Sequence, residues 1–135
     1  MVPSRQGDGS GTGRMLKRGL IATMVVLTCT TAAAFTSDGN EYDLSCNANG
    51  YVLRSQDRVS HSYERNGRTR TMTGRETLYL GRSCDAFHQT FRVGKWCWTE
   101  RGFGTEFVEK SYWFPNQALL CPGSHPLNER RDCRC

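Results

Sequence analysis

The segment that decides the fold is YLGRSCDAFHQTFRVGKWCWTERGFGTEF, residues 79–107. It contains two cysteines and two of the three tryptophans of the chain. A two-residue turn at Arg101-Gly102 predicts a β-hairpin in which Glu100 lies opposite Phe103. Side chains alternate between the two faces of a strand, so the aromatic residues of this hairpin share one face: Trp96, Trp98, Phe103 and Phe107. That face is large and apolar, and a second layer must cover it.

A short helix is predicted just before this hairpin. The residues that favour it are a capping serine, an acid in the first turn, two phenylalanines on one face and a terminal glycine: Ser83, Asp85, Phe87, Phe91 and Gly94. A helix of about two turns is not stable alone. We therefore expect a Cys84–Cys97 disulfide to attach the helix to the hairpin.

The N-terminal residues 1–34 have the pattern of a secretory signal peptide. A basic segment from Arg14 to Arg18 precedes the apolar residues 19–29, and Ala32 to Ala34 supply small residues for cleavage. The apolar run is too short to span a membrane. Met15 gives a better-proportioned signal than Met1, and acylation of Cys29 is the alternative interpretation. Cleavage after Ala34 leaves a mature domain of residues 35–135.

The mature domain keeps six cysteines: Cys46, Cys84, Cys97, Cys121, Cys133 and Cys135. An even number in a short exported chain predicts a disulfide framework. Cys121 is expected to pair with the tail, whereas Cys133 and Cys135 are too close to pair with each other. No CxxC pair supports a zinc site, and we expect neither a metal nor another cofactor. Residues 1–34 carry a net charge of +3, so the chain's +5 falls to +2 after cleavage, which argues against a nucleic-acid partner.

The other segments are short and rich in strand-forming residues. Strands are expected around residues 42–46, 51–54, 76–81 and 111–115, with a hairpin over residues 58–73 that turns at Asn66-Gly67. Residues 116–121 are a last strand or a turn, and the tail is ordered through its cysteines. The predicted fold is mainly β, a small disulfide-bonded antiparallel sandwich or barrel-like roll of six or seven strands with one short helix.

No catalytic residues are assigned from the sequence. His61 and His88 are the histidines within the predicted core elements, and His125 lies in the tail. A helix would bring Asp85 and His88 onto one face, which leaves a small secreted hydrolase using this pair as the alternative function. Ser83 lies near His88, but its role as a helix cap is sufficient to account for it.

Arginines are concentrated between residues 54 and 75: Arg54, Arg58, Arg65, Arg68, Arg70 and Arg75. In the Asn66-Gly67 register Arg65 faces Arg68, and Arg70 faces Tyr63, where a cation–π contact is available. These side chains form either an anion-binding hairpin or a solvated edge that resists aggregation. The candidate binding residues are the charged groups near two hairpin tips: Arg65, Arg68, Arg70, Glu100 and Arg101.

Several motifs carry a resemblance to known proteins. YLGRSCDAF, GKWCWTERGF and FPNQ…C resemble small exported proteobacterial proteins of unassigned function, over about residues 44 to 121. More distantly, YDLSC, the W-T-x-x-G hairpin and the cysteine after the last strand are similar to periplasmic inhibitors of c-type lysozyme. That resemblance implies a small β-barrel whose serine and lysine enter the active site of the enzyme, and Arg101 stands at the expected lysine position. Their GxxY loop is represented here only by GRETLY or LGRS.

These observations together predict a non-enzymatic binding domain of the periplasm or the extracellular space. Its expected partner is a protein or an anionic glycan, and inhibition of a wall-degrading enzyme is one form that this function could take. No membrane span is expected after signal cleavage.

Overall fold

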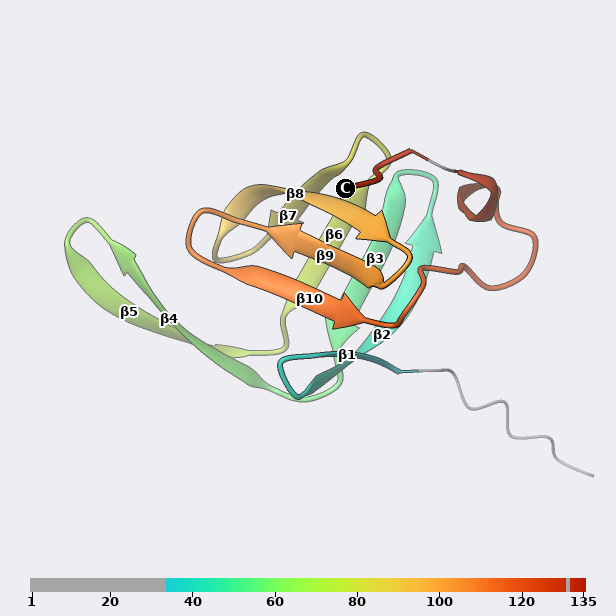
Figure 1. Cartoon of the computed structure of the whole chain (residues 1–135). Helices are drawn as coiled ribbons and strands as arrows, with labels where there is room; N and C mark the ends of the chain where they lie inside the picture. Colours follow the sequence, from blue (N-terminus) through green and yellow to red (C-terminus); the bar gives the residue numbers. More distant parts are fainter. Residues whose placement is uncertain (1–33, 131) are drawn as a thin grey trace, which may run out of the picture. The chain divides into compact units, whose positions relative to one another are not determined.

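Short strands separated by tight turns build one antiparallel sheet of eight strands (Figure 1). The computed structural model describes residues 34–130 and 132–135. The eight strands, in their order across the sheet, are β1 (Phe35–Ser37), β2 (Asn40–Asn47), β3 (Gly50–Ser55), β6 (Thr77–Gly81), β7 (Asp85–His88), β8 (Arg92–Thr99), β9 (Gly102–Glu106) and β10 (Ser111–Pro115). The predicted signal peptide and Cys29 lie outside the described residues.

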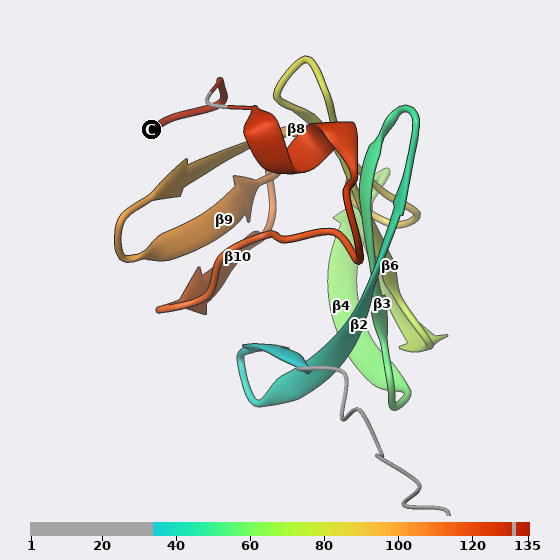
Figure 2. The same cartoon turned by 90° about the vertical axis from the view of Figure 1, so that its right-hand side faces the viewer.

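The first and last strands of this sheet approach each other and nearly close it into a barrel (Figure 2). Side-chain hydrogen bonds join them instead of a strand ladder. The backbone N–H of Thr36 donates over 2.8 Å to Oε1 of Gln117, which follows β10, and the N–H of Trp113 in β10 donates to Ser37 Oγ over 3.2 Å. The expected mainly β, barrel-like fold is therefore confirmed. Among the described residues there are ten strands and one short 3₁₀ helix, η1 (Pro126–Glu129).

The barrel interior is filled by the inward-facing side chains of the strands. Leu53 lies opposite Leu78 and Tyr51 opposite Leu80 on the β3–β6 pair. Phe103 and Phe114 stack with their ring centroids 4.6 Å apart, and both are almost fully buried. The side chains that alternate with these point outwards, as expected for strands with one buried face.

The β8–β9 hairpin forms, but its turn differs from the prediction by one residue. Thr99 pairs with Gly102 and Trp98 with Phe103, so the loop is Glu100-Arg101. Gly102 has φ of +133°, and a Cβ there would lie 2.2 Å from the carbonyl oxygen of Phe114, so this position requires glycine beside β10. Because the turn lies one residue earlier than predicted, each residue of β8 faces a residue of β9 two positions nearer the turn. A shift of two positions keeps every side chain on its predicted face, so the predicted aromatic face is preserved.

The predicted helix after Ser83 is wrong, because residues 85–88 form strand β7 between β6 and β8. Ser83 lies in the β6–β7 turn, and Cys84 has φ of +66°. On β7 the burial alternates, so Asp85 and Phe87 face outwards while Ala86 and His88 are buried. The buried side chains therefore recur every two residues, as in a strand, and not every three or four residues, as the predicted helix requires.

The hairpin of β4 (Val59–Arg65) and β5 (Arg68–Gly74) forms a separate two-stranded sheet inserted between β3 and β6. We call residues 59–74 the arm, and it projects beyond the eight-stranded sheet in Figure 1. Asn66 and Gly67 have φ of +55° and +68°, the left-handed values that the predicted turn requires. The predicted pairing of Arg65 with Arg68 and of Tyr63 with Arg70 is confirmed.

Three disulfides join the six described cysteines: Cys46–Cys121, Cys84–Cys133 and Cys97–Cys135. The predicted Cys84–Cys97 pair is wrong, because each of these cysteines pairs with the tail instead. Cys121 is bonded to β2 and not to the tail. The expectation that Cys133 and Cys135 reach separate partners is confirmed.

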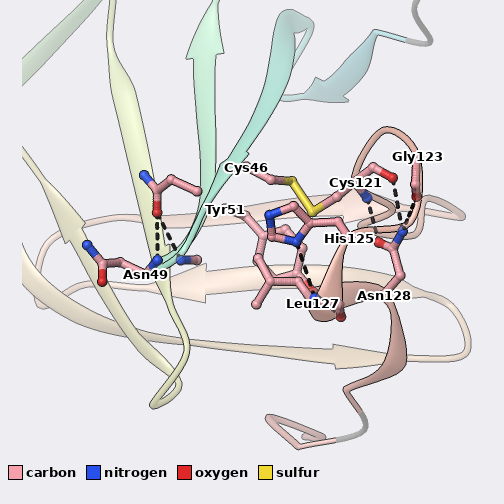
Figure 3. The surroundings of a disulfide bond; sticks show 10 residues. Cys46, Asn49, Tyr51, Cys121, Gly123, His125, Leu127 and Asn128 are labelled. Atoms are coloured by element: carbon pink, nitrogen blue, oxygen red, sulfur yellow. Dashed lines mark hydrogen bonds between the residues drawn. A yellow bond between two sulfur atoms is a disulfide. The ribbon is translucent and has the colours of Figure 1, made fainter.

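The segment after β10 forms no strand and is held by more than cysteines. Asn128 accepts a hydrogen bond from the backbone N–H of Cys121 over 2.7 Å and donates to its carbonyl over 3.0 Å (Figure 3). Leu127 is buried, and its carbonyl accepts from the Tyr51 hydroxyl over 3.1 Å. His125 accepts from the Leu127 N–H and so caps η1.

None of the described helices is long and apolar enough to cross a membrane.

Peptide mapping of the oxidised protein without reduction should recover these three pairs. Removal of the Cys46–Cys121 bridge by paired alanine substitution should lower the free energy of unfolding by about 2–5 kcal/mol, as is typical for a small domain. Chemical denaturation measures this loss. A peptide that joins Cys84 to Cys97 would contradict the pairing.

Candidate functional site

Glu76 is a fully buried acid immediately before β6. Its backbone is held on both sides by Ser55. The N–H of Glu76 donates to Ser55 Oγ over 2.9 Å, and the N–H of Ser55 donates to the Glu76 carbonyl over 3.0 Å. These bonds fix the point where the chain returns from the arm to the barrel, and they direct the carboxylate inwards.

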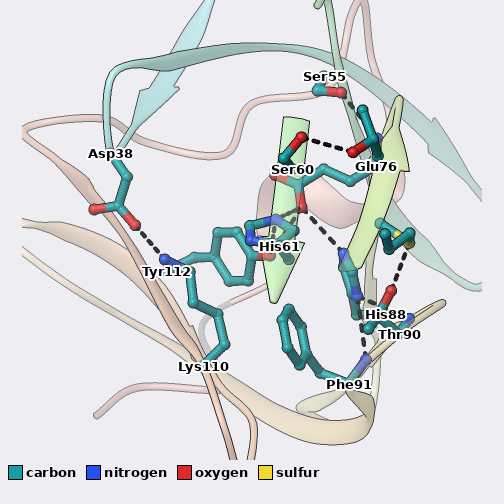
Figure 4. A network of polar contacts seen from close by, with 12 residues as sticks. Asp38, Ser55, Ser60, His61, Glu76, His88, Thr90, Phe91, Lys110 and Tyr112 are labelled. Carbon is teal, nitrogen blue, oxygen red and sulfur yellow. Dashed lines mark hydrogen bonds and ion pairs between the residues drawn. The ribbon is translucent and has the colours of Figure 1, made fainter. Parts of the chain in front are cut away.

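Four side chains from four strands surround the Glu76 carboxylate. Figure 4 shows three of them, His61, His88 and Tyr112. The Tyr42 hydroxyl of β2 donates to Oε1. On Oε2, the Nε2 atoms of His61 and His88 lie at 2.5 and 3.1 Å. The Tyr112 hydroxyl of β10 donates to the same oxygen over 2.9 Å. We call Tyr42, His61, Glu76, His88 and Tyr112 the carboxylate cluster.

The protonation of His88 follows from its other ring nitrogen. Nδ1 of His88 lies 3.0 Å from the backbone N of Thr90 and 3.3 Å from that of Phe91. Both backbone groups are donors, so Nδ1 must be an acceptor without a proton. Nε2 therefore carries the proton of a neutral imidazole and donates it to Glu76.

These donors explain why Glu76 is ionised although it is buried. Burial alone raises the pKa of a carboxyl group. The hydrogen bonds from His88, Tyr42, His61 and Tyr112 outweigh this effect and lower the pKa of Glu76 to about 2. Burial and the adjacent Glu76 charge raise the pKa of both tyrosines, so their hydroxyls remain protonated donors.

His61, Glu76 and His88 also have the residue types of a metal site, since their ligand atoms lie within 4.8 Å of one another. The geometry does not fit a cation. A metal on Nε2 of His88 would need a neutral ring with its proton on Nδ1, where two backbone N–H groups already point. Glu76 Oε2 also lies within hydrogen-bonding distance of both imidazoles. We therefore interpret the cluster as a hydrogen-bonded carboxylate.

The carboxylate cluster fixes the base of the arm to the barrel. The His61 side chain is 12% exposed, and its ring packs against Phe91 with 5.4 Å between centroids. Val59 is buried, and Met72 of β5 accepts a hydrogen bond from the Thr90 hydroxyl. Both strands of the arm are therefore anchored to the barrel near its base, β4 through His61 and β5 through its cross-strand partner Met72.

The three predicted binding residues of the arm share one face. Arg65 pairs with Arg68, and Arg70 pairs with Tyr63, so all four side chains lie on the face that also carries His61. The three arginines are exposed. The predicted contact of Arg70 with Tyr63 is corrected, because Arg65 lies over the Tyr63 ring, 5.5 Å from its centroid. The opposite face carries Ser60, Ser62, Glu64 and threonines.

The two other predicted binding residues lie at the opposite end of the barrel. Each strand of the sheet runs from one end to the other, and the β8–β9 turn with Glu100 and Arg101 is at the end where the C-terminal tail packs. The turns 38–39 and 89–91 lie with the arm at the other end. Glu100 lies 3.4 Å from Arg134. The structure therefore does not unite the two hairpin tips in one site.

The Asp85–His88 pair of the alternative hydrolase is not formed, because the two side chains leave β7 on opposite faces. Ser83 is exposed in a turn and does not contact His88 among the described hydrogen bonds. Glu76, Tyr42 and Tyr112 belong to none of the motifs from which functional residues were predicted. The one available signal was an acid at the start of the apolar strand sequence ETLYLG.

Comparison of the chain with protein-family models, with curated proteins and with solved structures finds no match.

Because Glu76 is ionised in the folded state, the free energy of unfolding is expected to depend on pH in the acidic range. Because its pKa in the folded state, about 2, lies below the ordinary value of 4.5, its contribution is complete above pH 4.5 and is lost as the pH falls towards 2. We expect the free energy of unfolding to fall across this window by on the order of 3 kcal/mol. Urea titrations at a series of pH values measure the slope.

Glu76→Gln should remove most of this slope and destabilise the protein at pH 7 by about 1–3 kcal/mol, because an amide donates where four donors already point. Asp43→Asn, an exposed acid on the outer face of β2, is the matched control and should keep the slope. An unchanged slope in Glu76→Gln, or a rise of the unfolding temperature of the wild type with Zn²⁺, would contradict the hydrogen-bonded cluster.

Proposed function

We propose that this chain is a non-enzymatic binding domain of the periplasm or the extracellular space, and that the arm recognises an anionic glycan. The single observation that supports this most is the gathering of Arg65, Arg68 and Arg70 on one exposed face of the arm. Three disulfides are typical of proteins in an oxidising compartment, which agrees with the proposed location.

Like charges that lie directly opposite each other on paired strands destabilise the pair. Arg65 and Arg68 are in this position at the tip of the arm. A bound anion would relieve the repulsion, and a guanidinium can donate two parallel hydrogen bonds to a carboxylate, sulfate or phosphate. Tyr63 adds an aromatic surface beside them.

The shape of the arm favours a polymer over a single small anion. Side chains two residues apart on one strand face, as in Arg68 and Arg70, are separated by about 6.6–7 Å. An anionic polysaccharide presents its charges at regular intervals and can therefore contact successive arginines. The anchored base reduces the entropy that the arm loses on binding.

Column retention on immobilised heparin or polygalacturonate tests the proposal. The oxidised wild-type domain should be retained, and Arg65→Ala/Arg68→Ala should weaken binding by about 1 kcal/mol or more, about fivefold in Kd. Arg54→Ala/Arg92→Ala removes the same charge from exposed sites outside the arm and is the matched control. Equal losses in both variants would show that only net charge matters and would refute an arm site.

Inhibition of a wall-degrading enzyme is the particular form of binding that the resemblance suggested, and it involves the other end of the barrel. Arg101 is exposed at the tip of the β8–β9 turn, where its backbone is fixed by hydrogen bonds to Thr99 Oγ1 and to the N–H of Asn116. A long cation on a fixed turn has the chemistry needed to enter an acidic active-site cleft.

If this form holds, the oxidised domain should slow c-type lysozyme on a cell-wall substrate, and Arg101→Ala should relieve the inhibition by about fivefold or more in Ki. The arm variant Arg65→Ala/Arg68→Ala should inhibit as the wild type does. Full lysozyme activity at high molar excess of the domain would exclude this form and leave the arm proposal in place.

A further inference from the structure

A row of apolar side chains crosses the outer face of four adjacent strands. Val52 of β3 lies opposite Tyr79 of β6, Tyr79 opposite Phe87 of β7, and Phe87 opposite Val93 of β8. Tyr79 is 42% exposed, Phe87 37% and Val93 74%. The rings of Tyr79 and Phe87 are in contact, with 6.1 Å between centroids. Contiguous exposed apolar surface of this kind is characteristic of binding sites.

One end of this row forms the wall of a hollow of about 740 Å³. Val52, Tyr79 and Phe87 line it, together with Arg130 of the tail and with polar residues in or next to the β2–β3 and β6–β7 turns: Asn47, Asn49, Arg82 and Asp85. Val93 is in the row but does not line the hollow. The volume is within the range of small-ligand sites, about 300–1,000 Å³.

The polar groups of the hollow are held in place by the fold. Arg82 donates to the Ala48 carbonyl over 3.3 Å and so connects the two turns. The Cys84–Cys133 disulfide fixes the chain between Arg82 and Asp85 to the tail. The Asp85 carboxylate lies directly over Gly81, where a Cβ would be 2.2 Å from Oδ1, so a side chain at position 81 would displace the carboxylate. Rigid groups of this kind reduce the entropy lost on binding.

The Asp85 carboxylate has no hydrogen-bond or ion-pair partner among the described residues. Its acceptor oxygens are available beside the donor groups of Arg82 and Asn49. Two guanidiniums line the hollow, those of Arg82 and Arg130, and they are balanced by Asp85 and by Asp132, which forms an ion pair with Arg130. The rim is therefore left without excess charge of either sign. The hollow therefore suits an uncharged ligand that offers both hydroxyl donors and acceptors, in contrast to the cationic arm.

We infer that this hollow binds a neutral sugar ring of an oligosaccharide. The face of an aromatic ring is negative, and the C–H groups on one face of a pyranose are weakly positive, so Tyr79 and Phe87 form a stacking surface for the ring. Asp85 accepts from the sugar hydroxyls, and Arg82 and Asn49 donate to them. This site is separate from the arm, and its test does not depend on the proposed function.

Two-dimensional NMR of the ¹⁵N-labelled, oxidised domain, titrated with cellotetraose and chitotetraose, tests the inference. Saturable shift changes should appear at the amides of Gly81 to Phe87 at millimolar oligosaccharide and spare those of Arg65 to Arg70. Phe87→Ala and Asp85→Asn should each raise the Kd by about fivefold or more. Val93→Ala, from the same row but outside the hollow, should leave it unchanged.

The substituted side chains are exposed, so the variants should fold, and retained near-UV circular dichroism checks this. Absence of shift changes in residues 81–87 with both oligosaccharides would overturn the inference. Equal weakening by Val93→Ala would also overturn it, because it would place the oligosaccharide on the flat apolar row and not in the hollow. Arm shifts with heparin but none in the hollow would reject this site alone and leave the arm proposal standing.

Discussion

The structure depends on one interaction, the acceptance of four hydrogen bonds by the buried carboxylate of Glu76. An ionised group inside a protein is costly unless it is fully hydrogen-bonded. The donors come from β2, β4, β7 and β10, so the requirement that Glu76 be satisfied brings these strands to one point. Because the partners are specific in position, the cluster selects one arrangement of strands more sharply than apolar contacts alone do.

The two ends of the barrel are stabilised by different kinds of interaction. At the arm end, hydrogen bonds and the rings of Phe91 and His61 connect the inserted hairpin to the barrel. At the opposite end, three disulfides and the hydrogen bonds of Asn128 hold the C-terminal tail. Each end carries charged turns on a rigid support, and this separation allows the arm, the β8–β9 turn and the hollow to be examined independently.

Much of the fold follows from local sequence. Asn66-Gly67 predicts the arm and its register because this dipeptide adopts the left-handed turn at low cost. The helix predicted between Ser83 and Gly94 was wrong because a capping residue and helical spacing are only weak preferences. Pairing with β6 and β8 on both sides provides hydrogen bonds that an isolated two-turn helix lacks. The Cys84–Cys97 prediction depended on that helix and was wrong with it.

The sequence by itself determined the β class, the number of bridges available to the cysteines of residues 35–135 and the common face of Arg65, Arg68 and Arg70. Strand alternation and turn preference act over a few residues, and cysteines can be counted directly. Only the tertiary structure decided the disulfide pairing, the burial of Glu76 and the hollow beside Tyr79. The donors to Glu76 lie 34, 15, 12 and 36 residues away in the chain. No local pattern encodes which distant hydroxyl or imidazole will meet a given acid, since these groups meet only once the strands have assembled into the sheet.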